Sequence, residues 1–118
     1  MIKGEKIVSY VKYYNEIEAE YREKLAEAKR KADVREVFIY ILLKFLSKID
    51  DSIDQSYSEF IKFEGESFEI LSPLKEKVEK LAEKSDLHAI IERIFEAARN
   101  RYIKIEHDEN TDYFNLQK

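Results

Sequence analysis

Apolar side chains recur at three- and four-residue spacing through residues 33–49, the most hydrophobic stretch of the chain. This spacing is typical of one face of an α-helix. Further apolar residues widen the face until only a narrow polar strip is left, at Glu36, Lys44, Ser47 and Lys48. A helix that is apolar over most of its circumference has to be surrounded by other elements. We therefore expect a central helix in which Phe38, Leu42 and Phe45 are almost fully buried.

The hydrophobic pattern predicts further helices on both sides of this one. Asp33 stands where the N-cap of the central helix is expected, and Glu36 would complete a capping box. Ser72 and Pro73 are typical of a helix start, as a capping serine followed by proline at the first helical position. The other predicted helices cover about 5–31, 53–63 and 73–84, and a last one opens at Ser85 and Asp86.

No alternating pattern is long enough to predict a sheet. Residues 64–67, with Gly65, form the clearest break, and Phe68, Ile70 and Leu71 are expected to cross the core as an extended connector. The predicted fold class is all-α, a single-domain bundle of four to five helices with a central apolar second helix. The domain covers residues 1–118, and the acidic segment 50–69 is expected to form a side arm.

Composition supports one helical domain and excludes several kinds of site. The chain has 118 residues, 39% of them charged, with two glycines and one proline. Cysteine is absent, which excludes disulfides and the thiolate ligands of common structural zinc sites. The sequence shows no signal peptide and no apolar run of membrane-spanning length, so we expect a cytoplasmic protein without membrane contact.

The net charge of −4 conceals an asymmetry along the chain. Residues 29–35 carry four positive charges against one negative charge, whereas residues 50–69 carry seven negative charges against Lys62 alone. Because salt screens charges beyond about 10 Å, a local basic surface can act independently of an acidic total.

Catalytic and metal-binding motifs are sparse. The chain lacks a Gly-rich nucleophile turn and a phosphate-binding loop, so no catalytic residue is assigned. Asp108, Asn110 and Asp112 match the first three ligand positions of a calcium loop, but Tyr113 replaces the required glycine. We therefore expect neither a metal nor a cofactor.

Arg101 and His107, separated by five residues and preceded by Asn100, resemble the arginine–histidine motif of HEPN ribonucleases. The resemblance implies RNA cleavage by a symmetric helical dimer. In the usual form of that motif the asparagine directly follows the arginine, which here would be Arg99, and the histidine is then too distant. An HEPN-type ribonuclease using Arg101 and His107 is one alternative for the function.

A second resemblance covers more of the chain, about residues 33–116. Val34-Arg35 at the start of the central helix and Leu74-Lys75-Glu76-Lys77 after the acidic segment resemble the small helical subunit of type III-A CRISPR interference complexes, the Csm small subunit. Farther along, the family's aromatic residue and its small-residue–arginine pair would fall near Lys80 and Glu83-Lys84 and are replaced. The resemblance implies a non-catalytic subunit that binds the backbone of the crRNA–target duplex and contacts other subunits of the complex.

The candidate RNA-binding residues are basic side chains of three regions, because phosphate contacts need cations and not base-reading groups. They are Lys29, Arg30, Lys31 and Arg35 at the first helix junction, Lys75, Lys77 and Lys84 on the fourth predicted helix, and Arg93, Arg101 and Lys104 on the fifth. The alternative interpretation is a salt-bridged surface on a helical interaction module that binds no nucleic acid. We also expect self-association or partner binding through Tyr113, Phe114 and Leu116.

Overall fold

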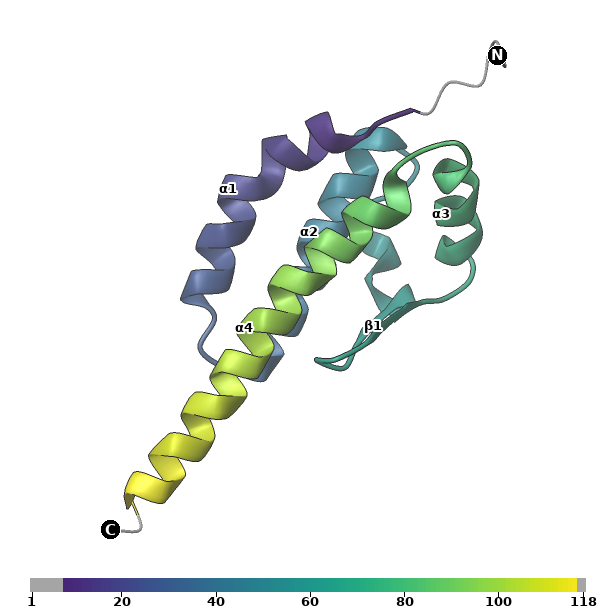
Figure 1. Ribbon diagram of the computed structural model, residues 1–118. Helices are drawn as coiled ribbons and strands as arrows, with labels where there is room; N and C mark the ends of the chain where they lie inside the picture. The colour runs from purple at the N-terminus through teal and green to yellow at the C-terminus, as the bar shows by residue number, and fades with distance from the viewer. Residues whose placement is uncertain (1–7, 117–118) are drawn as a thin grey trace.

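The computed structural model describes the backbone of residues 8–116 and the side chains of residues 8–108. Helices dominate this part of the chain, which confirms the predicted all-α bundle (Figure 1). In chain order the elements are α1 (Val11–Glu27), α2 (Lys31–Ile49), the 3₁₀ helix η1 (Gln55–Phe60), β1 (Ile61–Phe63), β2 (Phe68–Ile70), α3 (Leu74–Ala82) and α4 (Leu87–Leu116).

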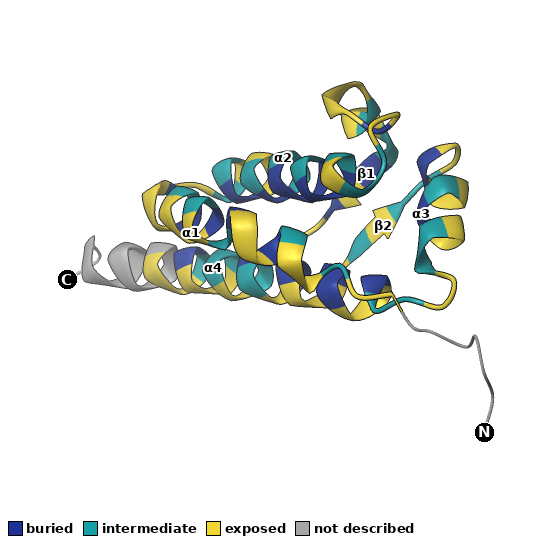
Figure 2. Ribbon diagram, turned by 90° about the horizontal axis from the view of Figure 1, so that it is seen from above, coloured by how far each residue is buried: buried dark blue, intermediate teal, exposed yellow. Residues whose placement is uncertain are grey.

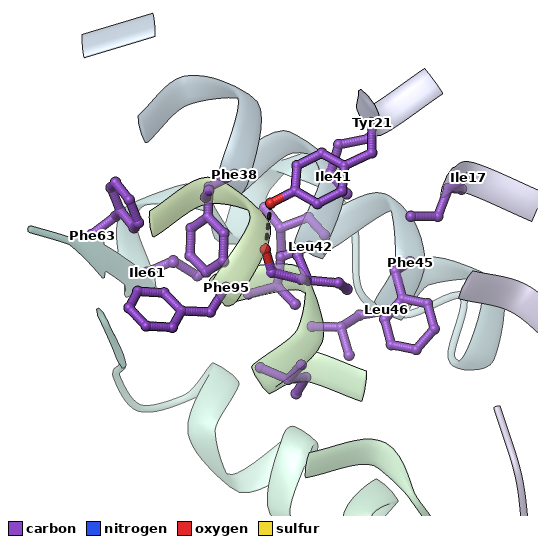
Figure 3. Close-up of a cluster of buried hydrophobic side chains, with 14 of the residues drawn as sticks. Ile17, Tyr21, Phe38, Ile41, Leu42, Phe45, Leu46, Ile61, Phe63 and Phe95 are labelled. Atoms are coloured by element: carbon purple, nitrogen blue, oxygen red, sulfur yellow. Dashed lines mark hydrogen bonds between the residues drawn. The ribbon is translucent and has the colours of Figure 1, made fainter. Parts of the chain in front are cut away.

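Helix α2 is the centre of the fold, as its sequence predicts. It contacts α1, α4, η1 and β1, and α1 and α3 lie on opposite sides of the α2–α4 pair (Figures 1 and 2). Phe38, Leu42 and Phe45 are each 0% exposed, which confirms the prediction of their burial. The Phe38 ring lies 5.0 Å from that of Phe63 and 6.1 Å from that of Phe95, so aromatic contacts join three elements (Figure 3).

The predicted third helix is wrong over half its length, and so is the prediction that no sheet forms. The segment contains the short helix η1 and then the strand β1, which pairs antiparallel with β2. Alternation explains the strand, since Ile61 and Phe63 are buried while Lys62 between them is exposed. Gly65 forms the turn with a φ of +89°, a conformation that side chains other than glycine rarely adopt. Strand β2 coincides with the expected extended connector.

The acidic segment 50–69 is therefore not a side arm. Its acidic side chains are exposed except for the half-buried Asp50, but Ile53, Ile61 and Phe63 are buried in the main core. Burying these three apolar side chains stabilises the packing of η1 and β1 against α2.

The start of α2 also differs from the expectation. The helix begins at Lys31, with Arg30 at the N-cap position, and Asp33 lies inside the first turn. The Asp33 carboxylate accepts hydrogen bonds from the backbone N–H groups of Lys29 and Arg30, with N···O distances of 3.2 and 3.1 Å. These backbone hydrogen bonds hold the pKa of Asp33 below its ordinary value. Asp33 thus caps the helix from its third position.

Helix α1 is shorter than predicted because its first residues are held by the loop before α4. Val8 forms a parallel bridge with Ser85, and the Asp86 carboxylate accepts the Ser9 hydroxyl at 2.7 Å and the Tyr10 N–H at 2.9 Å. The Ser9 hydroxyl in turn accepts the N–H of Val11, the first residue of α1. The bridge at Val8 and these hydrogen bonds keep residues 8–10 out of α1, which starts at Val11.

Helix α3 starts at Leu74 and ends at Ala82, inside the predicted limits. Pro73 occupies the N-cap position, and the Ser72 hydroxyl donates to the Glu76 carboxylate at 2.5 Å instead of capping the backbone. Helix α4 begins directly after Ser85 and Asp86, as predicted, and its last turns extend beyond the α1–α2 loop (Figure 1). The side chains of Tyr113, Phe114 and Leu116 lie outside the described residues.

Candidate nucleic-acid interface

Arg101 of α4 positions the loop between α1 and α2. Its guanidinium donates to the backbone carbonyl of Ala26 at 3.3 Å and to that of Ala28 at 2.7 Å. The last carbonyls of a helix lack intrahelical partners and carry the negative end of the helix dipole. Arg101 therefore satisfies these carbonyls and offsets the negative end of α1 beside the basic run.

Two cations of the basic run have acidic partners. The Lys31 Nζ lies 3.1 Å from the Glu106 carboxylate and 5.4 Å from the centre of the Tyr102 ring. Arg30 lies 3.7 Å from the Asp33 carboxylate. These contacts agree with the alternative prediction of a salt-bridged surface for part of the run.

Lys29 and Arg35 are different, because no acidic side chain of the described residues lies within ion-pairing distance of either. Both are exposed; Lys29 lies just before the first residue of α2, and Arg35 lies in its second turn. An exposed cation without an acidic partner is available to an incoming anion without the cost of breaking an ion pair.

The hairpin adds a cation that was not among the predicted site residues. Lys62 of β1 is exposed and, within the described residues, has no ion pair. It lines a hollow of about 420 Å³ with Arg35, and Arg35 also lines a second hollow of about 170 Å³ with Lys31 and Tyr102. Because both hollows share Arg35 and Phe63, they form one shallow groove between α2 and the hairpin. We call the three cations that line it, Lys31, Arg35 and Lys62, together with Lys29 and Arg30 just before α2, the junction surface.

The groove has a mixed lining. Phe63 and Tyr102 provide aromatic surface, while Glu64 is an acidic group within the same lining as Lys62. An arrangement of this kind can hold phosphate groups through separate cations and cover sugar surface with its aromatic side chains.

The remaining predicted residues do not join one surface. Lys75 and Lys77 are on α3, on the other side of α2 and α4 from α1 (Figures 1 and 2). The Lys77 Nζ donates to the Ser52 hydroxyl at 3.0 Å, and the carbonyl of Lys84 accepts the Val8 N–H at 2.8 Å. The Arg93 guanidinium lies over the Tyr14 ring, 5.6 Å from its centre. Of the α4 candidates, Arg101 contacts the α1–α2 loop, while Lys104, one turn later, is exposed.

The structure of one chain does not bring Arg101 and His107 together. Six residues of α-helix correspond to about 9 Å along the axis and about 120° around it, so the two side chains leave α4 in different directions. Arg101 is half-buried against α1 through its carbonyl contacts, whereas His107 is exposed. A second copy of the chain would have to supply the missing half of such a pair.

Within the described part of the chain, no group of three or more metal-ligating side chains is placed to hold an ion. The helices there also include none with the length and hydrophobicity needed to cross a bilayer.

Lys62 is not among the predicted RNA-binding residues, because it is the single cation of the acidic segment 50–69. One sequence pattern indicates its position. Ile61-Lys62-Phe63 and Phe68-Glu69-Ile70 alternate on either side of a break that contains Gly65, which is typical of a β-hairpin.

Comparison of the chain with protein-family models, with curated proteins and with solved structures gave no match in any of the three. Function is therefore inferred from the surface of this chain.

Proposed function

We propose that the chain is a cytoplasmic, non-catalytic, RNA-binding scaffold subunit of a multisubunit ribonucleoprotein, similar to the small helical subunit of type III-A CRISPR interference complexes. The observation that carries the proposal is the junction surface, where Arg35 and Lys62 line one groove and Lys29 lies in the loop just before α2, all three without an ion pair among the described residues. Its partners would be the backbone of the crRNA–target duplex and neighbouring protein subunits.

The chemistry of the junction surface fits phosphate contacts. Lysine and arginine at a shallow groove neutralise phosphates without reading bases, so binding should be independent of sequence and sensitive to salt. Three unpaired cations give only weak affinity, because each phosphate contact contributes a slope of about −0.7 to −0.9 to the dependence of log K on log salt. Such a surface suits a subunit whose binding is reinforced by neighbours along the same RNA.

The test replaces the three unpaired cations together, in the variant Lys29→Gln/Arg35→Gln/Lys62→Gln. Binding to short fluorescent RNA duplexes of two unrelated sequences is measured by anisotropy over a range of salt concentrations. We expect equal weakening for both sequences and a salt slope that is shallower by about 2–3, one contact per cation removed. The matched control, Lys12→Gln/Arg22→Gln/Lys80→Gln, removes the same charge from exposed positions outside the junction surface.

Two results would overturn the proposal. If the control variant lost as much affinity as the junction variant, binding would follow net charge and not this surface. If the unaltered protein bound no RNA at low salt, alone or with partner subunits, the chain would instead be a helical interaction module that binds no nucleic acid. RNA cleavage by the purified chain that disappears in His107→Ala would instead establish the ribonuclease alternative, since a scaffold needs no proton transfer.

A further inference from the structure

The backbone of the α1–α2 loop is anchored to the helix on each side. The loop contains only Ala28, Lys29 and Arg30. The Ala28 N–H donates to the Leu25 carbonyl at 3.1 Å, and the Arg30 carbonyl accepts the Val34 N–H at 3.3 Å. Ala28 is buried, whereas Lys29 and Arg30 are exposed. The two basic side chains therefore extend from a loop whose ends are fixed.

Two charged side chains from outside the loop hold its backbone as well. The Arg101 guanidinium of α4 donates to the Ala28 carbonyl at 2.7 Å and to a carbonyl in the last turn of α1 at 3.3 Å. The Asp33 carboxylate of α2 accepts the N–H groups of Lys29 and Arg30. A cation thus binds the carbonyl side of the loop and an anion binds its N–H side, so the backbone that carries both basic side chains is ordered before any ligand arrives.

The guanidinium of Arg101 is committed to this contact. Its side chain is half-buried, and its Nε is buried without a hydrogen-bond partner among the described residues. The same terminal nitrogen bonds to both carbonyls. To reach a phosphate the guanidinium would have to leave the carbonyl of the buried Ala28, and a buried acceptor that loses its donor costs free energy. Arg101 is therefore placed to hold the loop and not to meet RNA directly.

We propose that Arg101 and Asp33 are positioning residues of the junction surface, which raise RNA affinity through the loop that they hold and contact no phosphate themselves. This inference rests on the proposed function and deepens it. Ordering the backbone of one residue during binding lowers affinity about five- to thirtyfold, and a loop that is already ordered avoids this loss. The charge of Asp33 alone would repel RNA, so any favourable effect of Asp33 has to come through the backbone.

Amide hydrogen exchange of the full chain without RNA tests whether Arg101 holds the loop. Arg101→Met removes the donors and keeps an unbranched side chain. Arg99→Met is the matched control, because it removes the same charge from α4 at a residue that pairs with Glu96. We expect the Lys29 and Arg30 amides to exchange about tenfold faster in Arg101→Met, the equivalent of about one backbone hydrogen bond, and at the unaltered rate in Arg99→Met.

A double-mutant cycle in RNA binding tests whether Arg101 acts through the loop. On the same two RNA duplexes, Arg101→Met should weaken binding about tenfold, the equivalent of ordering the backbone of one residue. In a Lys29→Gln/Arg30→Gln background the loop has no cation to position, so Arg101→Met should change affinity by less than about twofold. A direct phosphate contact of Arg101 would instead cost the same in both backgrounds.

The variant Asp33→Ala separates positioning from charge, because the two predict opposite results. It removes a negative charge that lies 3.7 Å from the Arg30 guanidinium, so charge alone would strengthen RNA binding. The loss of the bonds to the loop N–H groups would weaken it. We expect weaker binding, by up to about tenfold, with the helix content unchanged in circular dichroism.

The positioning roles are overturned by any of four results. These are unchanged exchange of the loop amides in Arg101→Met, an equal cost of Arg101→Met with and without the two loop cations, a loss in Arg99→Met as large as in Arg101→Met, and stronger binding by Asp33→Ala. In each case the unaltered chain still binds RNA, so the proposed function would stand. Absence of RNA binding by the unaltered chain would refute both. Should Arg101→Met not fold, the sign of the change in Asp33→Ala decides the outcome.

Discussion

Replacing Gly65 by alanine tests whether the hairpin turn and α4 fit as closely as the structure indicates. Gly65 has a φ of +89° and is buried against the Tyr102 ring. A Cβ built at this position would lie 2.7 Å from the Tyr102 Cδ1 and closer still to Cε1 and Cζ. The ring is held in turn by an edge contact with Phe63, with 5.9 Å between the ring centres, and by Lys31 over its face.

Two costs add in this substitution. A residue with a side chain loses about 1–2 kcal/mol in the left-handed backbone region, and overpacking a filled space costs a further 1–3 kcal/mol or so. We expect Gly65→Ala to lower the free energy of unfolding by about 2–5 kcal/mol, a large part of the about 5–15 kcal/mol of a typical domain. Urea denaturation followed by circular dichroism measures the loss.

A double-mutant cycle separates the two costs. In a Tyr102→Ala background the clash is absent, so Gly65→Ala should cost only the backbone part, about 1–2 kcal/mol. Equal costs of Gly65→Ala in both backgrounds would refute the contact with Tyr102. A cost below about 0.5 kcal/mol with Tyr102 present would refute the turn geometry as well.

Four further predictions concern the core, the ends of the chain and pH. Phe45→Ala should lower the free energy of unfolding by about 3–5 kcal/mol in urea denaturation, because Phe45 is 0% exposed; a loss below 1 kcal/mol or so would contradict its central place. Tyr21→Phe should cost about 0.5–1.5 kcal/mol by the same measurement, since the buried Tyr21 hydroxyl donates to the Ile94 carbonyl; no loss would show that the bond contributes nothing. Desolvation raises the pKa of Asp86, but hydrogen bonds from Ser9 and the Tyr10 N–H outweigh it and leave the pKa below its ordinary value. The stability from Asp86 is thus present above the ordinary aspartate pKa and lost as pH falls through the lowered one, so unfolding curves of Asp86→Asn and the unaltered chain should converge in acid; parallel curves would contradict this. A chain ending at Asp108 should lose self-association or partner binding in light scattering, and unchanged mass and binding would remove the role expected for Tyr113, Phe114 and Leu116.

The sequence predicted the parts of the fold whose patterns are long. The apolar positions of 33–49 extend over several helical turns, so the period is clear and the burial of Phe38 and Phe45 followed from it. Strands β1 and β2 have three residues each, so alternation within either strand alone does not distinguish it from a helical face, and the hairpin shows only when both are read together across the break at Gly65. Their stability comes from rings of α2 and α4 that are distant in the chain.

The candidate site also has one part that the sequence could predict and another that depends on the fold. Lys29 to Arg35 are neighbours in sequence, so their charge could be seen directly. The nearness of Lys62 to Arg35 depends on a hairpin that was not predicted. The hydrogen bonds from Arg101 to the Ala26 and Ala28 carbonyls join residues more than seventy positions apart, and no local sequence pattern predicts a contact of that range.

Both ends of α1 are completed by residues from the last third of the chain. Asp86 holds the start through Ser9 and Tyr10, and Arg101 takes the carbonyls at the end. An isolated helix of 17 residues is marginal in water, and most of its stability in a protein comes from packing. During synthesis α1 is therefore completed late, because the residues that hold its two ends are translated after α2, the hairpin and α3. Until then α1 has only α2 to pack against, since its contacts with α4 and the bonds at both of its ends are still missing.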